Sequence, residues 1–100
     1  MVTKIEELDG KVFVTLEGEM DTVAALEAEE VLNPLANGGK DVIIECGKLV
    51  YIASSGLRIF LSILKGTSAT GNTVILRHVN NDIKTVFTMT GFMKIFKFEK

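Results

Sequence analysis

Hydrophobic and polar residues alternate near the start of the chain, in residues 11–17 (KVFVTLE). Apolar residues at every second position are typical of a strand with one buried face, so this segment is predicted to be a strand. Residues 3–8 (TKIEEL) are predicted to pair with it. Between the two segments, Asp9 and Gly10 form a turn pair whose glycine tolerates a positive φ, which predicts an antiparallel hairpin.

The first predicted helix follows Asp21 and Thr22, which can cap its start. Its apolar residues recur at i, i+4, i+7 and i+11, while the acidic residues fall largely on other sides of the cylinder. Pro34 should loosen the last turn, and residues 37–39 (NGG) should end the helix. The predicted apolar face comprises Ala24, Ala28, Val31 and Leu35.

Three later apolar runs have the length and composition of strands. Residues 41–46 (DVIIEC) are rich in β-branched side chains and are predicted to form a strand near the sheet centre that is covered on both faces. Residues 73–78 (TVILRH) and the tail at 94–99 (KIFKFE) are predicted to be the remaining strands. Cys46 falls in the first of these runs, so we expect its thiol to be buried.

Helical spacing of the apolar residues returns from Leu57. Ser54 or Ser55 is the natural N-cap of this second predicted helix, because a hydroxyl can accept a hydrogen bond from a free backbone N–H. Gly66 and Gly71 are expected to bracket the loop that follows. The apolar face, spaced at i, i+3, i+4 and i+7, comprises Leu57, Phe60, Leu61 and Leu64.

A short third helix is predicted between Asp82, as its cap, and Gly91, which should end it. The element order is then β-β-α-β-α-β-α-β, without a linker or internal repeat. Strand-helix-strand crossovers are right-handed and make their strands parallel or near neighbours. The pattern therefore predicts one α/β domain over residues 1–100, with a mixed central sheet and helices packed on it.

Composition is that of an ordinary globular domain: 47% of the 100 residues are hydrophobic, 24% are charged, and the net charge is −2. So mild a charge gives no indication of nucleic-acid binding. No apolar run reaches the ~18–20 residues of a membrane span, and the N-terminus lacks the pattern of a signal peptide. Because Cys46 is the only cysteine, no intrachain disulfide is possible, and we expect a cytoplasmic protein without direct membrane insertion.

The sequence offers little for catalysis. The ASSG of residues 53–56 is not a G-x-S-x-G nucleophile elbow, and a triad would have to recruit His78, the only histidine, from the end of a predicted strand. No cluster of Cys, His, Asp and Glu has metal-ligand spacing, and no glycine-rich nucleotide loop is present. We therefore expect no enzyme activity, no cofactor and no metal.

Three motifs resemble one family when they are taken together. They are GEMD at residues 18–21, YIASSGL at 51–57 and IKTVFTMTGFMKIFKFE at 83–99. In this order and spacing they are similar to the STAS domain of bacterial anti-sigma factor antagonists. The resemblance covers almost the whole chain and lacks only the C-terminal helix that many members carry after the last strand.

The resemblance implies a regulatory switch. Unphosphorylated members of the family bind an anti-sigma factor, often itself a serine kinase, and so free the sigma factor. The kinase phosphorylates a serine of the antagonist, and a phosphatase reverses the modification. The family pattern at this site is Asp-Ser-Ser/Thr-Gly-Leu/Ile, and its acceptor serine corresponds to Ser54, with Ser55 as the second choice.

The resemblance also implies a partner-binding edge around Ser54. Asp21 matches the last residue of the family's GE-hydrophobic-D pattern. Gly56 should leave room for a kinase or a phosphate to approach the backbone. Arg58 often has a small residue as its family counterpart, so it either bears on which partner is accepted or is simply a solvated charge. The predicted partner-binding residues are Asp21, Ala53, Ser54, Ser55, Gly56 and Arg58.

Ala53 departs from the family pattern, which has aspartate at this position. A methyl group can neither accept a hydrogen bond nor present charge to a kinase. This departure favours an alternative function, in which the domain is a STAS scaffold, or a subunit of a stress-signalling or transport assembly, without a phosphate cycle.

Overall fold

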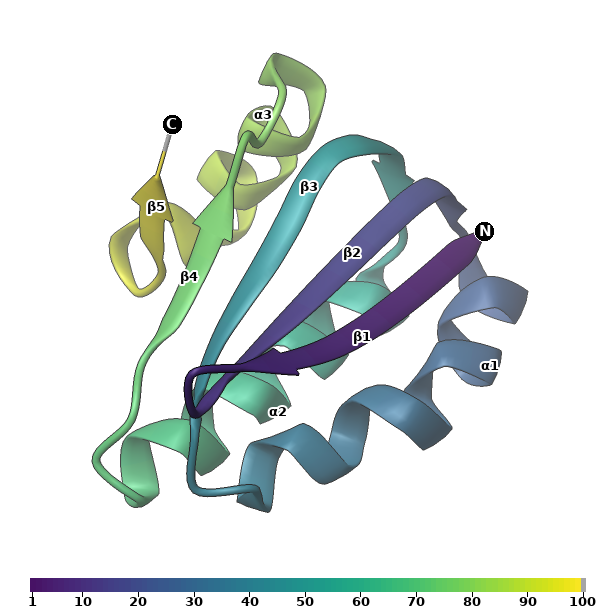
Figure 1. Cartoon of the computed structure of the whole chain (residues 1–100). Helices are drawn as coiled ribbons and strands as arrows, with labels where there is room; N and C mark the ends of the chain where they lie inside the picture. Colours follow the sequence, from purple (N-terminus) through teal and green to yellow (C-terminus); the bar gives the residue numbers. More distant parts are fainter. Residues whose placement is uncertain (100) are drawn as a thin grey trace.

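Five strands form one mixed sheet in the computed structural model, which describes residues 1–99. The strands lie in the order β1-β2-β3-β4-β5, with β1 antiparallel to β2 and the other pairs parallel (Figure 1). The predicted α/β fold with a mixed sheet is confirmed. The elements are β1 Val2–Leu8, β2 Lys11–Met20, α1 Thr22–Leu32, the 3₁₀ helix η1 Asn33–Asn37, β3 Asp41–Ile52, α2 Ser54–Ala69, β4 Val74–Arg77, α3 Asn81–Thr90, the 3₁₀ helix η2 Phe92–Lys94 and β5 Lys97–Glu99.

The N-terminal hairpin forms as its alternating pattern predicts. Leu8 pairs with Lys11, so Asp9 and Gly10 make a two-residue turn, with φ of 54° and 75°. Positive φ at both central residues gives the turn the twist that a tight hairpin needs. The predicted central position of the strand is also confirmed, because β3 lies third of five, although it extends well past Cys46 to Ile52. The prediction that helices cover both of its faces is wrong, because the α-helices form one core with a single face of the sheet.

All three α-helices pack on the same face of the sheet. The register places Val14, Ile44 and Leu76 side by side on neighbouring strands, and each is fully buried. Phe98 of β5 continues this row, and its ring centroid lies 5.7 Å from that of Phe87 in α3. Figure 1 shows α1 and α2 side by side beneath this face. The main core therefore lies between the sheet and the helices.

The predicted apolar face of the first helix is wrong. Ala28 is buried as expected, but Val31 is 48% exposed, and Leu35 lies beyond the helix in η1, which has Pro34 in its first turn. Apolar side chains occur on several sides of this segment, so the pattern does not fix its rotation about the axis. Packing fixes it instead, and the buried residues are Ala25, Ala28 and Leu32.

Gly66 does not begin a loop, which corrects a second prediction. α2 continues to Ala69, and the chain turns at Gly71 with a φ of 78°. The hydroxyl of Thr67 donates to the Ile63 carbonyl at 2.9 Å, inside the helix. Gly66 lies where α2 crosses η1, because a Cβ at this position would come within 2.3 Å of the carbonyl oxygen of Ala36.

The third helix and the last strand also differ from their predictions. Asn80, not Asp82, caps α3, because its side-chain oxygen accepts the N–H of Ile83 at 2.9 Å. Gly91 ends the helix in the left-handed conformation, as predicted. The tail is a strand only over Lys97–Glu99, because η2 precedes it and turns aromatic side chains into the core.

Cys46 is fully buried, as predicted. Burial, with a smaller contribution from the neighbouring Glu45 carboxylate, raises the pKa of the Cys46 thiol to about 12. The thiolate is the reactive form of cysteine. This side chain is therefore a core residue and is unreactive at neutral pH.

Candidate functional site

Two neighbouring parallel strands end together at the candidate site. Met20, the last residue of β2, pairs with Ile52, the last residue of β3. The N–H of Ala53 donates to the Met20 carbonyl at 2.8 Å. Because α1 and α2 begin directly after these strand ends, Asp21 and Ser54 are carried to the same edge of the sheet.

Asp21 caps α1. Its Oδ1 accepts the N–H of Ala24 at 2.8 Å, and its backbone has the extended conformation of an N-cap. The side chain is exposed, so its second carboxylate oxygen faces solvent at the same edge. The cap predicted from the sequence is thus confirmed, and it leaves this carboxylate accessible to a partner.

Ala53 is the N-cap of α2, which corrects the prediction that Ser54 or Ser55 fills this role. Ala53 has an extended backbone with φ −81° and ψ 166°, and its side chain makes no capping hydrogen bond. Ser54 is already the first helical residue. The sequence pattern favours serine as a cap, but the length of β3 places the strand end, and therefore the cap, one residue earlier.

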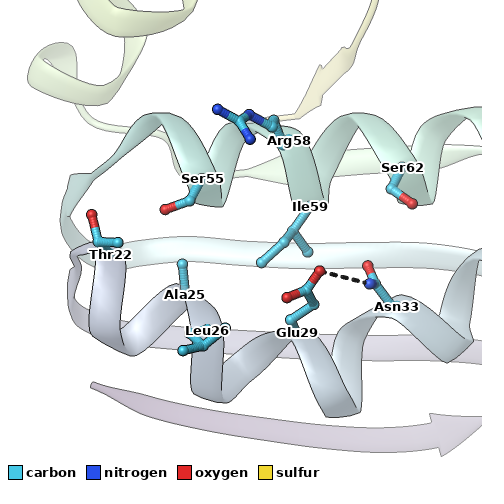
Figure 2. A pocket seen from close by; sticks show the side chains of 9 residues that line it. All are labelled: Thr22, Ala25, Leu26, Glu29, Asn33, Ser55, Arg58, Ile59 and Ser62. Carbon is cyan, nitrogen blue, oxygen red and sulfur yellow. Dashed lines mark hydrogen bonds between the residues drawn. The ribbon is translucent and has the colours of Figure 1, made fainter.

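The two serines at the start of α2 differ in access to solvent. Ser54 is exposed, whereas the Oγ of Ser55 is enclosed and has no hydrogen-bond partner among residues 1–99. Figure 2 shows the Ser55 hydroxyl directed toward Thr22 of α1. A molecule approaching from solvent would therefore meet the hydroxyl of Ser54 first.

Gly56 is buried, and this overturns the expectation that it opens the backbone to an approaching group. A Cβ on Gly56 would lie 2.8 Å from Cγ1 of Ile52 and 2.9 Å from Sδ of Met20. Both distances are shorter than van der Waals contact. The missing side chain instead lets the first turn of α2 pack directly on the ends of β2 and β3.

A groove of about 280 Å³ runs between α1 and α2 beside these residues (Figure 2). Ala25 and Ile59 form part of its apolar lining. Arg58 lies at the rim, on the side of α2 that faces away from α1. The residues that line the groove are Thr22, Ala25, Leu26, Glu29, Asn33, Ser55, Arg58, Ile59 and Ser62.

Most of these lining residues were missed by the sequence analysis. Leu26 is 69% exposed, and Glu29 accepts a hydrogen bond from the Asn33 side chain at 3.2 Å. On each helix the lining residues are spaced at i, i+3 and i+4, which could have indicated that they lie on one face of that helix. Only the packing of α1 against α2 brings the two faces together. Among residues 1–99, no group of three or more His, Cys, Asp and Glu side chains is placed to hold a metal ion.

The uncapped start of α2 leads to a stability prediction. Ala53→Asp is expected to raise the free energy of unfolding by about 1 kcal/mol at pH 7, because aspartate is preferred to alanine at an N-cap by roughly 0.5–2 kcal/mol. The extended backbone of Ala53 already suits a cap. Urea denaturation of the two proteins measures the difference.

The pH dependence of this gain separates the charge from the hydrogen bond. The helix dipole favours the ionised carboxylate, so the introduced group should have a lower pKa in the folded protein than in the unfolded chain. The gain is then present above the unfolded pKa and is lost as pH falls through the folded pKa. Ala53→Asn, an uncharged cap, should remain stabilising in acid. Equal stability of the Asp and Ala forms at pH 7 would contradict the assignment of this cap.

The sequence profile of the STAS domain matches residues 3–100. The chain therefore belongs to the STAS domain family, as its three motifs predicted. Of the helices formed by residues 1–99, none is long and apolar enough to cross a membrane.

Similar proteins include named antagonists. The chain is 28% identical over 97 residues to BtrV of Bordetella bronchiseptica, a candidate anti-sigma factor antagonist, covering 96% of this chain and 84% of that protein. It is 30% identical over 79 residues to the anti-sigma-B factor antagonist of Staphylococcus aureus, covering 78% of this chain and 73% of the relative.

The fold is that of the anti-sigma factor antagonist SpoIIAA of Bacillus. The unphosphorylated form of SpoIIAA superimposes with a TM-score of 0.80 at 19% identity, covering 99% of this chain and 88% of SpoIIAA. The phosphorylated form gives a TM-score of 0.77 at 20% identity, covering 99% and 92%. At this identity the likeness establishes the fold alone.

Proposed function

We propose that this protein is an anti-sigma factor antagonist whose partner binding is switched off by phosphorylation of Ser54. In the unmodified form it binds an anti-sigma factor and so frees the sigma factor. Membership of the STAS family and the names of its relatives support this function. SpoIIAA, which has the same fold, exists in unphosphorylated and phosphorylated forms.

The exposure of Ser54 at the first position of α2 is the observation that supports this serine as the phosphorylation site. A phosphate there adds roughly −1.5 to −2 charges next to backbone N–H groups that no side chain caps. Negative charge at a helix N-terminus is favourable, so the fold should tolerate it. Its effect should therefore fall on the partner, through repulsion and lost fit.

The proposed partners are proteins. They are an anti-sigma factor that also acts as the serine kinase, and a phosphatase that restores the unmodified form. Binding and modification take place in the cytoplasm. The protein itself catalyses no reaction in this scheme, because its part is to bind, to be modified and to be released.

Ser54→Asp is expected to weaken binding to the anti-sigma factor by about tenfold or more, equivalent to roughly 1.4 kcal/mol of binding free energy. The thermal midpoint should stay nearly unchanged, because aspartate in the first turn of a helix is favourable. Titration calorimetry beside thermal melts separates the two effects.

Ser68→Asp is the matched control, because Ser68 is also an exposed serine of α2 but lies at its far end. It should leave the affinity unchanged. Peptide mass spectrometry after incubation with kinase and ATP should find one phosphate on Ser54. Phosphate on Ser55 alone, or equal loss of affinity in both aspartate variants, would refute the assignment.

A second candidate function is a STAS scaffold, or a subunit of a stress-signalling or transport assembly, without a phosphate cycle. Ala53 is the observation that favours it, because this residue offers a kinase neither charge nor a hydrogen-bond acceptor. The phosphorylation rate of the Ala53→Asp variant distinguishes the two functions. A native protein modified as fast as this variant removes the support for the scaffold, whereas modification of the variant alone favours it.

A further inference from the structure

Arg58 lies about one helical turn beyond Ser54 on α2, and both side chains are exposed. Residues spaced i and i+4 are neighbours on a helix surface, with about 5–6 Å between their Cβ atoms. Arginine is long enough to span this gap. A phosphate carried by Ser54 would therefore lie within reach of the Arg58 guanidinium.

The guanidinium of Arg58 is not engaged by a carboxylate within the described part of the chain. Glu29, which lines the same groove, accepts a hydrogen bond from Asn33 at 3.2 Å instead. Arg58 can therefore move to a new anion without breaking an existing ion pair. The ion pairs found among residues 1–99 are Lys40 with Glu7 and Arg77 with Glu99, and His78 shares a hydrogen bond with Glu45 at 2.8 Å.

Arg58 is the cation of α2 that lies nearest to Ser54. Asp21, which caps α1 at the same edge of the sheet, is a carboxylate and would repel a phosphate on Ser54. Ala53, the residue directly before Ser54, carries no charge, so it neither repels the phosphate nor competes for the arginine. The opposite charge nearest in sequence is that of Arg58.

We propose that Arg58 is the counter-ion of a phosphate on Ser54, an inference that rests on the proposed modification of this serine. An anion placed four residues before a cation is the favourable order for an ion pair on a helix. The planar guanidinium can also donate two parallel hydrogen bonds to phosphate oxygens. Phosphorylation then has two effects on a partner at the groove, because it adds negative charge and also ties up an exposed cation.

The test uses phosphoserine installed at position 54 during translation, so that no kinase is needed. The second pKa of the phosphate is measured by ³¹P NMR titration in the native background, in Arg58→Gln and in Lys65→Gln. A neighbouring cation stabilises the dianion and so lowers this pKa. We expect the pKa to be higher by about 0.3–0.7 of a unit in Arg58→Gln than in the native background.

Lys65→Gln is the charge-matched control, because Lys65 is exposed on the same helix but lies eleven residues, about 16 Å, beyond Ser54. It should leave the pKa unchanged. Arg58→Lys, which keeps the charge but not the paired donors, should recover part of the shift. Identical pKa values in the native and Arg58→Gln backgrounds, with native circular dichroism in both, would overturn the proposal.

The ion pair between Arg58 and the phosphate can be tested independently of the proposed switch in partner binding. If the pKa shift is found but the phosphorylated protein binds the anti-sigma factor as tightly as the unmodified one, the ion pair stands and the switch fails. If phosphorylation abolishes binding but Arg58→Gln leaves the pKa unchanged, the switch stands and the ion pair is refuted.

Discussion

Phe87→Ala is expected to lower the free energy of unfolding by about 3–5 kcal/mol, the usual cost of removing a buried phenylalanine ring. Phe87 is fully buried on α3, and its ring stacks on Phe96 with centroids 5.9 Å apart. It also meets Phe60 of α2 edge-on at 6.2 Å, so it joins α3 to the helix that carries Ser54. No single neighbour can fill the space that the ring leaves.

Met89→Ala is the control for this change, because Met89 lies two residues further along α3 and is 82% exposed. Its loss should alter the free energy of unfolding by no more than about 0.5 kcal/mol. Urea denaturation followed by circular dichroism gives both values. A loss of less than about 1 kcal/mol in Phe87→Ala would mean that the aromatic cluster does not hold α3 to the core.

Gly66→Ala is expected to destabilise the protein by about 2 kcal/mol, although alanine is the better helix former by roughly 1 kcal/mol. The added Cβ would lie 2.3 Å from the carbonyl oxygen of Ala36 and 2.6 Å from its Cβ. The oxygen belongs to the backbone of η1, which cannot move aside as a flexible side chain could. Helix α2 and η1 would have to separate, and contacts on both would be lost.

Gly38→Ala tests whether the Gly66 effect comes from this contact. Gly38 also lacks strain, with a φ of −77°, but an added Cβ would come no closer than 3.6 Å to the Leu35 carbonyl oxygen. This variant should be neutral or stabilising by up to about 1 kcal/mol, because replacing glycine with alanine lowers the conformational entropy of the unfolded chain. A thermal midpoint that rises in Gly66→Ala, as helix propensity alone demands, would disprove the close approach.

The sequence predicted the protein family more securely than it predicted the atomic detail of the site. The three motifs identified the STAS family, and the family match over residues 3–100 confirms it. The motif also singled out Ser54, whose role stays a prediction. It did not reveal that Ser54 is exposed while the Oγ of Ser55 is enclosed, because the two serines are chemically identical and differ only in what surrounds them.

Local patterns by themselves determined the elements that depend on local physics. The alternation of hydrophobic and polar residues predicted the hairpin. The turn follows from Asp9 and Gly10 themselves, because these residue types adopt a positive φ without help from distant residues. Asp21 as a cap and Gly91 as a helix end are equally local, because each acts on backbone groups within a few residues.

Tertiary structure alone decided features that depend on a neighbour distant in the chain. The rotation of α1 was set by the sheet and α2, because its apolar residues lie on several sides. Gly66 was expected in a loop because glycine often breaks helices, but its reason is the backbone of Ala36, thirty residues away in the chain. Likewise, Gly56 is small because Met20 and Ile52 leave no space for a Cβ. A sequence pattern records which residues favour an element, whereas the space between two elements exists only after they have packed.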